Sequence, residues 1–272
     1  MISEIYLRAD FNLKHVHAGT TFRAPHLHLT SEKSGTQEAS GSNFSLPPWN
    51  SLNMALHVGD TAKTVRNNRA WVKQQLQFPT EPFWLDQVHG DDIIEVNSEN
   101  TPSLSEQHFI TKADGSYSYQ KKQVLAIMTA DCLPVLLVAE DCSWIAAAHC
   151  GWRSLAKGIL KKLVETAPVK TSLIHAWMGP CISQENYQVG NDVRQAFIAH
   201  VDTLSELDHY FQRDIDNRYR ADLYGLARLQ LAQCGVNQLT GGDRCTFAEE
   251  DYFYSYRREA VTGRMLSFIW LD

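Results

Sequence analysis

Short apolar runs of strand length recur along the chain, and segments with helical spacing lie between them. Several central runs are apolar at consecutive positions, as expected for strands buried on both faces. The pattern predicts strands at residues 5–8, 15–22, 83–88, 92–96, 124–129, 134–139, 144–148, 172–177 and 265–270. Apolar residues three or four positions apart predict helices at residues 61–76, 154–165, 191–200 and 221–234.

Polar residues and glycine mark the ends of several predicted helices. Thr61 or Asp60 can cap the first helix, Ser154 can cap the second, and Gly235 ends the last. Strands and helices alternate along the chain, and no internal repeat is evident. We therefore expect one domain over residues 1–272, of mixed α/β (α+β-like) class, with central mixed β-sheets flanked by helices.

The segment from Arg23 to Pro48 interrupts this pattern. It is rich in Ser, Thr, Gly, Glu and Pro and contains few large apolar residues. Because the strand patterns on either side are too short to stand alone, we interpret residues 23–48 as a long surface insertion within the domain.

The bulk composition narrows the class of protein. Of 272 residues, 44% are hydrophobic and 21% are charged, so the chain can bury a substantial core. A net charge of −6 argues against nucleic acid as a partner, although a local basic pocket for one phosphate ligand stays open. No stretch approaches the roughly 20 apolar residues of a membrane span. The N-terminus does not have the pattern of a secretion signal, and the six cysteines are spaced too irregularly to suggest a secreted disulfide framework. We therefore expect a cytoplasmic enzyme that acts on small molecules.

Three potential metal ligands, His89, Cys132 and His149, each follow an apolar strand and precede a turn containing Gly or Pro. Taken singly, such a histidine is more often a turn residue, and a buried cysteine usually behaves as a small hydrophobe. Together, two imidazoles and one thiolate predict a catalytic transition-metal site, with zinc as the first choice. Three protein ligands leave the fourth tetrahedral position for water or substrate.

Polar residues near these ligands suggest a ligand pocket. Arg153 lies at the start of a predicted helix that follows a strand and a Gly turn, an arrangement that predicts an anion-binding site. An equally good interpretation is that Arg153 only forms an ion pair with a nearby acid at the start of this helix. Asp131 precedes Cys132 and either orients a ligand or substrate hydroxyl, or caps a turn. Asn53 and His57 lie in a strand-like stretch, where each either faces a pocket or satisfies buried backbone.

Six blocks of the sequence resemble the YfiH-like, laccase-domain family of purine nucleoside phosphorylases. They occur in the family's order from about residue 50 to the C-terminus, and they read LNMALHVGD, DQVHG, TADCLP, AHCGWR, GPCI, and YSYRR with TGR. The chain departs from the family pattern at three places. The insertion at 23–48 replaces a short link, Cys150 stands where Ala is common, and Tyr256 where His is common.

The resemblance implies a YfiH-like fold, similar to that of a bacterial toxin with a Cys–His hydrolase site. It also implies zinc on His89, Cys132 and His149, the same three residues chosen above. The implied activity is phosphorolysis of adenosine, inosine, guanosine and 5′-methylthioadenosine, with adenosine deamination as a second activity. An older label of the family is copper-dependent polyphenol oxidase, so Cu²⁺ is the alternative metal.

These residues give a mechanistic hypothesis for phosphorolysis. Phosphate held by Arg153, with Arg257 as a second candidate, would attack the anomeric carbon of the ribose while the metal site assists departure of the purine. Asp131 is the candidate general acid/base, and Asn53 and His57 are candidate substrate-binding residues.

Three alternatives remain open on the sequence. A copper polyphenol oxidase is disfavoured because a multicopper enzyme needs many closely spaced histidines. A metal-free hydrolase would use Cys132 as nucleophile and His149 as base. A metal-stabilised interaction module without activity would have a closed fourth coordination position and no substrate-sized pocket.

Overall fold

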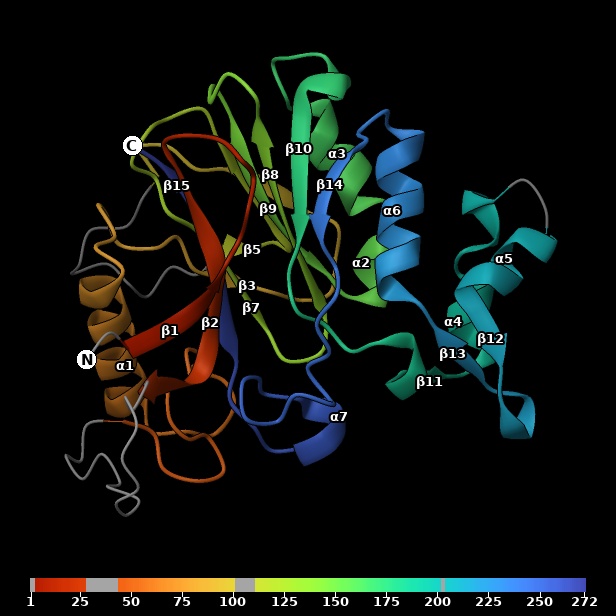
Figure 1. The fold of residues 1–272 in the computed structure, drawn as a ribbon, viewed down its shortest axis with the longest axis horizontal. Coiled ribbons are helices and arrows are strands. Elements are labelled where there is room, and N and C mark those ends of the chain that lie inside the picture. The colour runs from red at the N-terminus through yellow and green to blue at the C-terminus, as the bar shows by residue number, and fades with distance from the viewer. Residues whose placement is uncertain (1–2, 28–43, 101–110, 202–203) are drawn as a thin grey trace.

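Two β-sheets form the centre of the computed structural model, which describes residues 3–27, 44–100, 111–201 and 204–272 (Figure 1). The larger, mixed sheet has the order β14-β10-β8-β9-β6-β4. Its strands are β4 (Ile93–Glu95), β6 (Gly115–Ser118), β8 (Leu133–Ala139), β9 (Ile145–Cys150), β10 (Ile174–Met178) and β14 (Gln238–Gly241). The antiparallel sheet β1-β2-β15-β7 contains β1 (Ser3–Arg8), β2 (Val16–Leu27), β7 (Leu125–Thr129) and β15 (Met265–Leu271).

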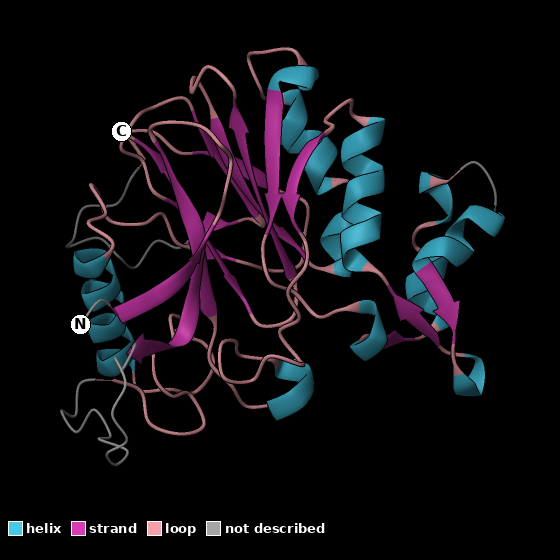
Figure 2. Ribbon diagram, in the orientation of Figure 1, coloured by secondary structure: helices cyan, strands magenta, loops and turns pink. Residues whose placement is uncertain are grey.

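Helices flank this centre, and two small sheets complete the fold (Figure 2). The helices are α1 (Ala62–Gln75), α2 (Trp152–Ala156), α3 (Ile159–Glu165), α4 (Asn191–Gln195), α5 (Leu204–Tyr210), α6 (Leu223–Gln233) and α7 (Tyr256–Glu259). One small sheet pairs β3 (Leu85–Asp86) with β5 (Thr111–Lys112). The other has the order β11-β13-β12 and comprises β11 (Gln188–Val189), β12 (Phe211–Arg213) and β13 (Tyr219–Ala221).

Alternation of side chains along β8 explains how the layers pack. Leu133, Val135 and Leu137 belong to the core shared with α3 and α6. Leu136 and Val138 point the other way and pack with residues of β7 and β15 in the second sheet. Successive side chains of a strand point to opposite faces, so a strand apolar at every position is buried on both sides. All seven residues of β8 are buried, which confirms the prediction from its unbroken apolar run.

The register of β6, β8 and β9 brings three strand ends together. Pro134 of β8 is opposite His149 of β9, and Leu133 is opposite Cys150. On the other side of β9, Gly115 of β6 is opposite Ala148. Cys132, just before β8, and Asp114, just before β6, therefore lie beside His149.

The predicted insertion begins later than the composition suggested. Residues 23–27 continue β2, so the prediction that the insertion starts at Arg23 is wrong. Arg23 pairs with Glu259 at 2.9 Å and is mostly buried, which ties this end of β2 to α7. At the other end, Ser45 is buried and its hydroxyl donates to Asp60 at 2.6 Å. Residues 28–43 of the predicted insertion lie outside the described residues.

Three predicted elements, at 154–165, 191–200 and 83–88, are broken or shortened in the structure. The helix predicted at 154–165 is two helices, α2 and α3, because Gly158 adopts a left-handed conformation (φ 79°) between them. Ser154 is inside α2, whose N-cap is Gly151, so Ser154 does not cap this helix. The helix at 191–200 is α4 followed by a single 3₁₀ turn, Ile198–His200, and the strand at 83–88 shortens to β3. No helix within the described ranges is long and apolar enough to cross a bilayer.

Candidate metal centre and its cavity

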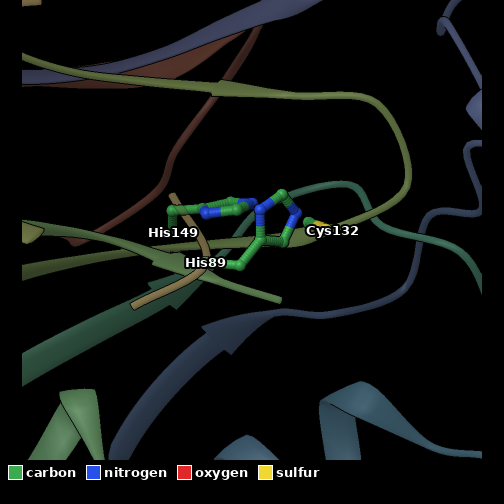
Figure 3. A group of neighbouring side chains, drawn as sticks. All are labelled: His89, Cys132 and His149. Carbon is green, nitrogen blue, oxygen red and sulfur yellow. The ribbon is translucent and has the colours of Figure 1, made fainter. Parts of the chain in front are cut away.

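The three predicted ligands meet at one end of the larger sheet, although they come from separate segments (Figure 3). His89 is in the loop after β3, Cys132 is in the turn between β7 and β8, and His149 is in β9. One ligand atom from each residue can be chosen so that all three lie within 4.8 Å of one another. The imidazole rings are 4.8 Å apart and nearly perpendicular. His149 is 3% exposed, whereas His89 is exposed to solvent.

A buried carboxylate, Asp114, positions both histidines. Its Oδ1 accepts from Nδ1 of His149 at 2.7 Å and from the backbone N–H of His89 at 2.9 Å. Its Oδ2 accepts from the backbone N–H groups of Val88 at 3.1 Å and Gly90 at 2.6 Å. One side chain therefore fixes three consecutive amides of the His89 loop, where His89 itself has a left-handed backbone (φ 59°).

The same carboxylate sets the chemistry of His149. A carboxylate only accepts, so Nδ1 of His149 carries the proton and Nε2 is free to act as a ligand. Burial alone would raise the pKa of Asp114, but the hydrogen bonds from His149, Gly90 and Val88 outweigh it and hold this pKa below its ordinary value. Asp114 thus stays ionised and keeps the ring of His149 in one orientation.

The surroundings of Cys132 and His149 favour a thiolate on the one and a protonated ring on the other. Burial opposes the charged thiolate, but the charge of His149 and hydrogen bonds to His149 and His89 lower the pKa of Cys132 to about 6. Burial opposes the charged imidazole too, and the thiolate together with Asp114 raises the pKa of His149 to about 9. The thiolate, which is the form that binds metals, is therefore available near neutral pH.

The three side chains fit a transition-metal ion. Tetrahedral zinc, with bonds of about 2.0–2.3 Å, needs ligand atoms roughly 3.3–3.8 Å apart. The three ligand atoms lie within 4.8 Å of one another, so a small rotation of the side chains would bring them to these distances. Gly151 leaves the space: a Cβ there would lie 3.2 Å from Sγ of Cys132 and 3.3 Å from Cδ2 of His89. Within the part of the chain that the structure describes, no other group of three His, Cys, Asp or Glu side chains approaches this closely.

The cluster opens onto a cavity of about 410 Å³, which is within the usual size range for small-molecule sites. The cavity wall combines the ligands with polar and cationic side chains: His57, Gln87, His89, Met128, Thr129, Ala130, Cys132, His149, Tyr256 and Arg264. A coordination position of a bound ion that no protein ligand fills would therefore open onto a cavity large enough for a substrate.

Of the two predicted substrate residues in the 51–60 segment, His57 lines the cavity and Asn53 does not. Burial lowers the pKa of His57, and the charges of Arg264 and Arg69 add to this effect while Asp86 opposes it. Asn53 is fully buried in an irregular loop rather than a strand. Its side-chain nitrogen donates hydrogen bonds to Asp60 and to the backbone carbonyl of Ala55. Its side-chain oxygen accepts from the backbone N–H groups of Ala55 and Arg264.

The two predicted phosphate-binding arginines lie outside the cavity wall. Arg153 is exposed, and its guanidinium is stacked 4.3 Å from the ring centre of Trp152. Arg257 is exposed as well, and its Nη1 donates to the backbone carbonyl of Gln188 at 2.9 Å.

Asp131 joins the Cys132 turn to α7. One carboxylate oxygen accepts from the hydroxyl of Thr246, and the other accepts from the backbone N–H of Arg257, both at 2.6 Å. Its backbone is left-handed (φ 88°), and its carbonyl accepts from Ile182 at 3.0 Å. Both oxygens are thus used to hold neighbouring segments around Cys132.

Sequence reasoning missed Asp114, Gln87 and Arg264. Asp114 stands between Ala113 and Gly115, where an aspartate is typical of an ordinary turn. Gln87 bonds both backbone groups of Met128, at 2.7 and 2.8 Å, and so fastens the His89 loop to β7. Arg264 is part of the TGR block noted above, which could have drawn attention to it.

Fold and site together define a mixed α/β protein with a His–Cys–His cluster in a small-molecule cavity. A family model described as "Multi-copper polyphenol oxidoreductase laccase" matches residues 35–272, and the chain belongs to this family, the YfiH family. "Purine nucleoside phosphorylase YfiH" of Escherichia coli (strain K12) is 44% identical over 227 residues, which cover 84% of this chain and 89% of that protein.

Solved structures agree with the fold. The crystal structure of YlmD from Geobacillus stearothermophilus has a TM-score of 0.85 and 30% identity, covering 100% of this chain and 98% of that one. A crystal structure of a Neisseria meningitidis protein gives a TM-score of 0.82 and 36% identity, with 98% and 99% covered. These likenesses confirm the predicted mixed α/β class and the resemblance to the YfiH-like family.

Proposed function

We propose that the protein is a zinc-dependent purine nucleoside phosphorylase that acts on adenosine, inosine, guanosine and 5′-methylthioadenosine. The observation that carries this proposal is the open His89–Cys132–His149 cluster lining a cavity of about 410 Å³. The name of the Escherichia coli relative, a purine nucleoside phosphorylase, supports the reaction class. On this proposal residues 1–272 form one cytoplasmic catalytic domain.

In phosphorolysis, an oxygen of phosphate forms a bond to the anomeric carbon of the ribose while the bond from that carbon to the purine nitrogen breaks. The electron pair of the broken bond goes to the purine, which takes up a proton, and the products are ribose 1-phosphate and the free base. Bound zinc would supply Lewis-acid polarisation and a water of lowered pKa. Asp114 would keep His149 and the His89 loop in place throughout the reaction.

The same cavity would support adenosine deamination, in which water replaces the amino group of the purine ring and ammonia leaves. This reaction needs no phosphate, so it separates the two activities experimentally. Asp131 stays our candidate for proton transfer in either reaction. Its participation requires one of its two hydrogen bonds, to Thr246 or to Arg257, to open.

The test is to incubate zinc-loaded protein with adenosine, with and without phosphate, and to identify the products. Phosphate-dependent formation of adenine and ribose 1-phosphate supports phosphorolysis, and inosine in both reactions supports deamination. If neither product forms, the proposed function is wrong.

Two further measurements decide between this function and its alternatives. Turnover under strictly anaerobic conditions contradicts a copper polyphenol oxidase, because that reaction consumes oxygen. Elemental analysis of protein purified without chelator tests the metal-free hydrolase. Active protein with Cys132 intact and with no zinc or copper bound would support that alternative.

A further inference from the structure

The guanidinium of Arg264 lines the cavity and forms no ion pair with any acid among the described residues. Nη1 of Arg264 donates to the backbone carbonyls of Thr262 at 3.1 Å and Gly263 at 2.9 Å. Among the described residues, its Nε and Nη2 have no hydrogen-bond acceptor, and no carboxylate lies within ion-pair distance of it. A partly buried cation with unused donors on a cavity wall is a site for an anionic ligand.

The chain holds Arg264 in this position from both sides. Its backbone N–H donates to the side chain of Asn53 at 3.0 Å, and its carbonyl accepts from the N–H of Met54 at 3.1 Å. Gly263 packs so tightly that a Cβ there would lie 2.6–2.9 Å from ring atoms of Tyr254. Asn53 is fully buried with its own polar groups satisfied, so the backbone from which the guanidinium extends is fixed in advance.

Groups of both charge signs, and one hydroxyl without a described partner, lie around Arg264. Arg69 adds a second positive charge nearby, which is balanced in part by Glu81. Burial lowers the pKa of Arg264, while the charges of Cys132, Asp131 and Tyr256 raise it. Thr129 lines the same cavity, and its buried hydroxyl has no partner among the described residues.

We propose that Arg264 is the centre of an anion-binding subsite that takes inorganic phosphate as the second substrate. This inference rests on the proposed phosphorolysis, and it assigns the phosphate to Arg264 rather than to Arg153 or Arg257. The planar guanidinium presents Nε and Nη2 side by side, which matches two oxygens of one phosphate. His57 lies on the same wall, and its ring offers a further hydrogen bond to a phosphate oxygen.

The location of the subsite suits a reaction between two substrates. Arg264 and the His89–Cys132–His149 cluster line one cavity, so a phosphate bound by Arg264 and a nucleoside held near the cluster would share the same space. Arg153 and Arg257 have no comparable position, because each is exposed and lies outside the cavity wall.

The test compares Arg264→Gln and Arg264→Lys with the matched controls Arg153→Gln and Arg257→Gln, all as zinc-loaded protein. We expect Arg264→Gln to raise KM for phosphate about 10- to 100-fold, as for loss of a charged hydrogen-bonding partner, and to change KM for adenosine far less. Arg264→Lys keeps the charge but loses the paired donors, so its KM for phosphate should be intermediate. Both controls should have wild-type values.

Two readouts besides phosphorolysis keep the inference separate from the proposed function. Calorimetric titration with inorganic phosphate should show binding to the wild type and to both controls, and greatly weakened binding to Arg264→Gln. Deamination of adenosine without phosphate should be retained in Arg264→Gln, which also demonstrates a folded site.

The outcomes are distinct. If the wild type binds phosphate through Arg264 but produces no ribose 1-phosphate, the subsite stands and the proposed function fails. If Arg264→Gln and Arg264→Lys bind phosphate and turn it over with wild-type constants, the subsite is overturned and the function stands. A loss confined to Arg153→Gln or Arg257→Gln would place the phosphate at that residue instead.

Discussion

Two parts of the cavity wall are built by opposite means: the cluster His89, Cys132 and His149, which we call the metal end, and Arg264, which we call the arginine end. At the metal end, three side chains from distant segments converge, and the single carboxylate of Asp114 positions two of them by accepting hydrogen bonds from four N–H groups. At the arginine end, one side chain carries the chemistry, and a neutral amide, Asn53, fixes its backbone. The metal end therefore depends on a buried carboxylate, whereas the arginine end depends on a neutral amide and on guanidinium donors that no described acceptor occupies.

This difference implies that a substitution can weaken ligand binding at one end and leave binding at the other end unchanged. Asp114 forms no hydrogen bond with Arg264 or Asn53, and Asn53 forms none with the three predicted ligands. Asp114 and Asn53 share no hydrogen-bond partner among the described residues, and substitutions at positions without shared partners tend to have additive effects. Metal affinity and phosphate affinity should therefore respond to separate sets of variants.

The largest effect is expected at the metal end, from Cys132→Ala. Loss of the only sulfur ligand should abolish both zinc retention and turnover, measured by elemental analysis and product formation. Calorimetry should still detect phosphate binding, because the arginine end is untouched. Phosphorolysis by a metal-free Cys132→Ala protein would refute the proposed role of the cluster.

Asp114→Asn should weaken zinc binding about 10- to 100-fold, as for removal of a carboxylate that orients a histidine ligand. An asparagine cannot accept from all four N–H groups, so the amides of residues 88–90 should also exchange their hydrogens faster. Competition with a chromophoric chelator measures the affinity. Asp60→Asn is the matched control, since Asp60 bonds Ser45, Asn53 and Thr61 but no predicted ligand. Equal losses in both variants would contradict a specific role for Asp114.

Asn53→Ala should act on the arginine end alone. Leaving buried partners unsatisfied costs about 1–3 kcal/mol of stability, and a less ordered Arg264 should raise KM for phosphate up to about tenfold. Urea unfolding and initial rates measure the two effects. A fall in zinc affinity with no change in KM would mean that the two ends are coupled after all.

The smallest effect concerns the free thiol of the metal-free protein. Because the pKa of Cys132 is about 6, its alkylation by iodoacetamide should fall as the pH drops through 6 and stay nearly constant from about 7 to 9. A thiolate of low pKa is a weaker nucleophile, so the rate at pH 7 should exceed that of an ordinary thiol only a few-fold. Peptide mass spectrometry resolves Cys132 from the buried Cys150 and Cys181, and a midpoint near 8.5 would contradict the lowered pKa.

The sequence was informative where side-chain type alone indicates chemistry. Residues 134–139 were predicted as a doubly buried strand, and β8 has that burial. His89, Cys132 and His149 could be chosen because soft ligands at strand ends form a recognisable set. Figure 3 shows how closely the structure brings them together.

The remaining features depend on contacts that no local pattern encodes. Whether an arginine can bind substrate depends on whether the fold places its guanidinium on the cavity wall, so Arg153 and Arg264 could not be ranked in advance. Asp114 lies 35 positions from His149 along the chain, and only the pairing of β6 with β9 brings them into contact. The break between α2 and α3 also went unpredicted, because Gly158 takes a left-handed conformation inside an otherwise regular apolar stripe.

Gly151 provides a way to empty the metal site without deleting a single ligand. Its backbone is in an ordinary extended conformation (φ −62°), so the residue is small for reasons of space rather than flexibility. A methyl group at position 151 would press on Cys132 at 3.2 Å and on His89 at 3.3 Å and would touch His149 at 3.6 Å, so we expect a larger side chain to fill the space between the three donors. A bulky residue at position 151 should therefore give a folded protein that keeps all three candidate ligands but has no space for a metal ion between them.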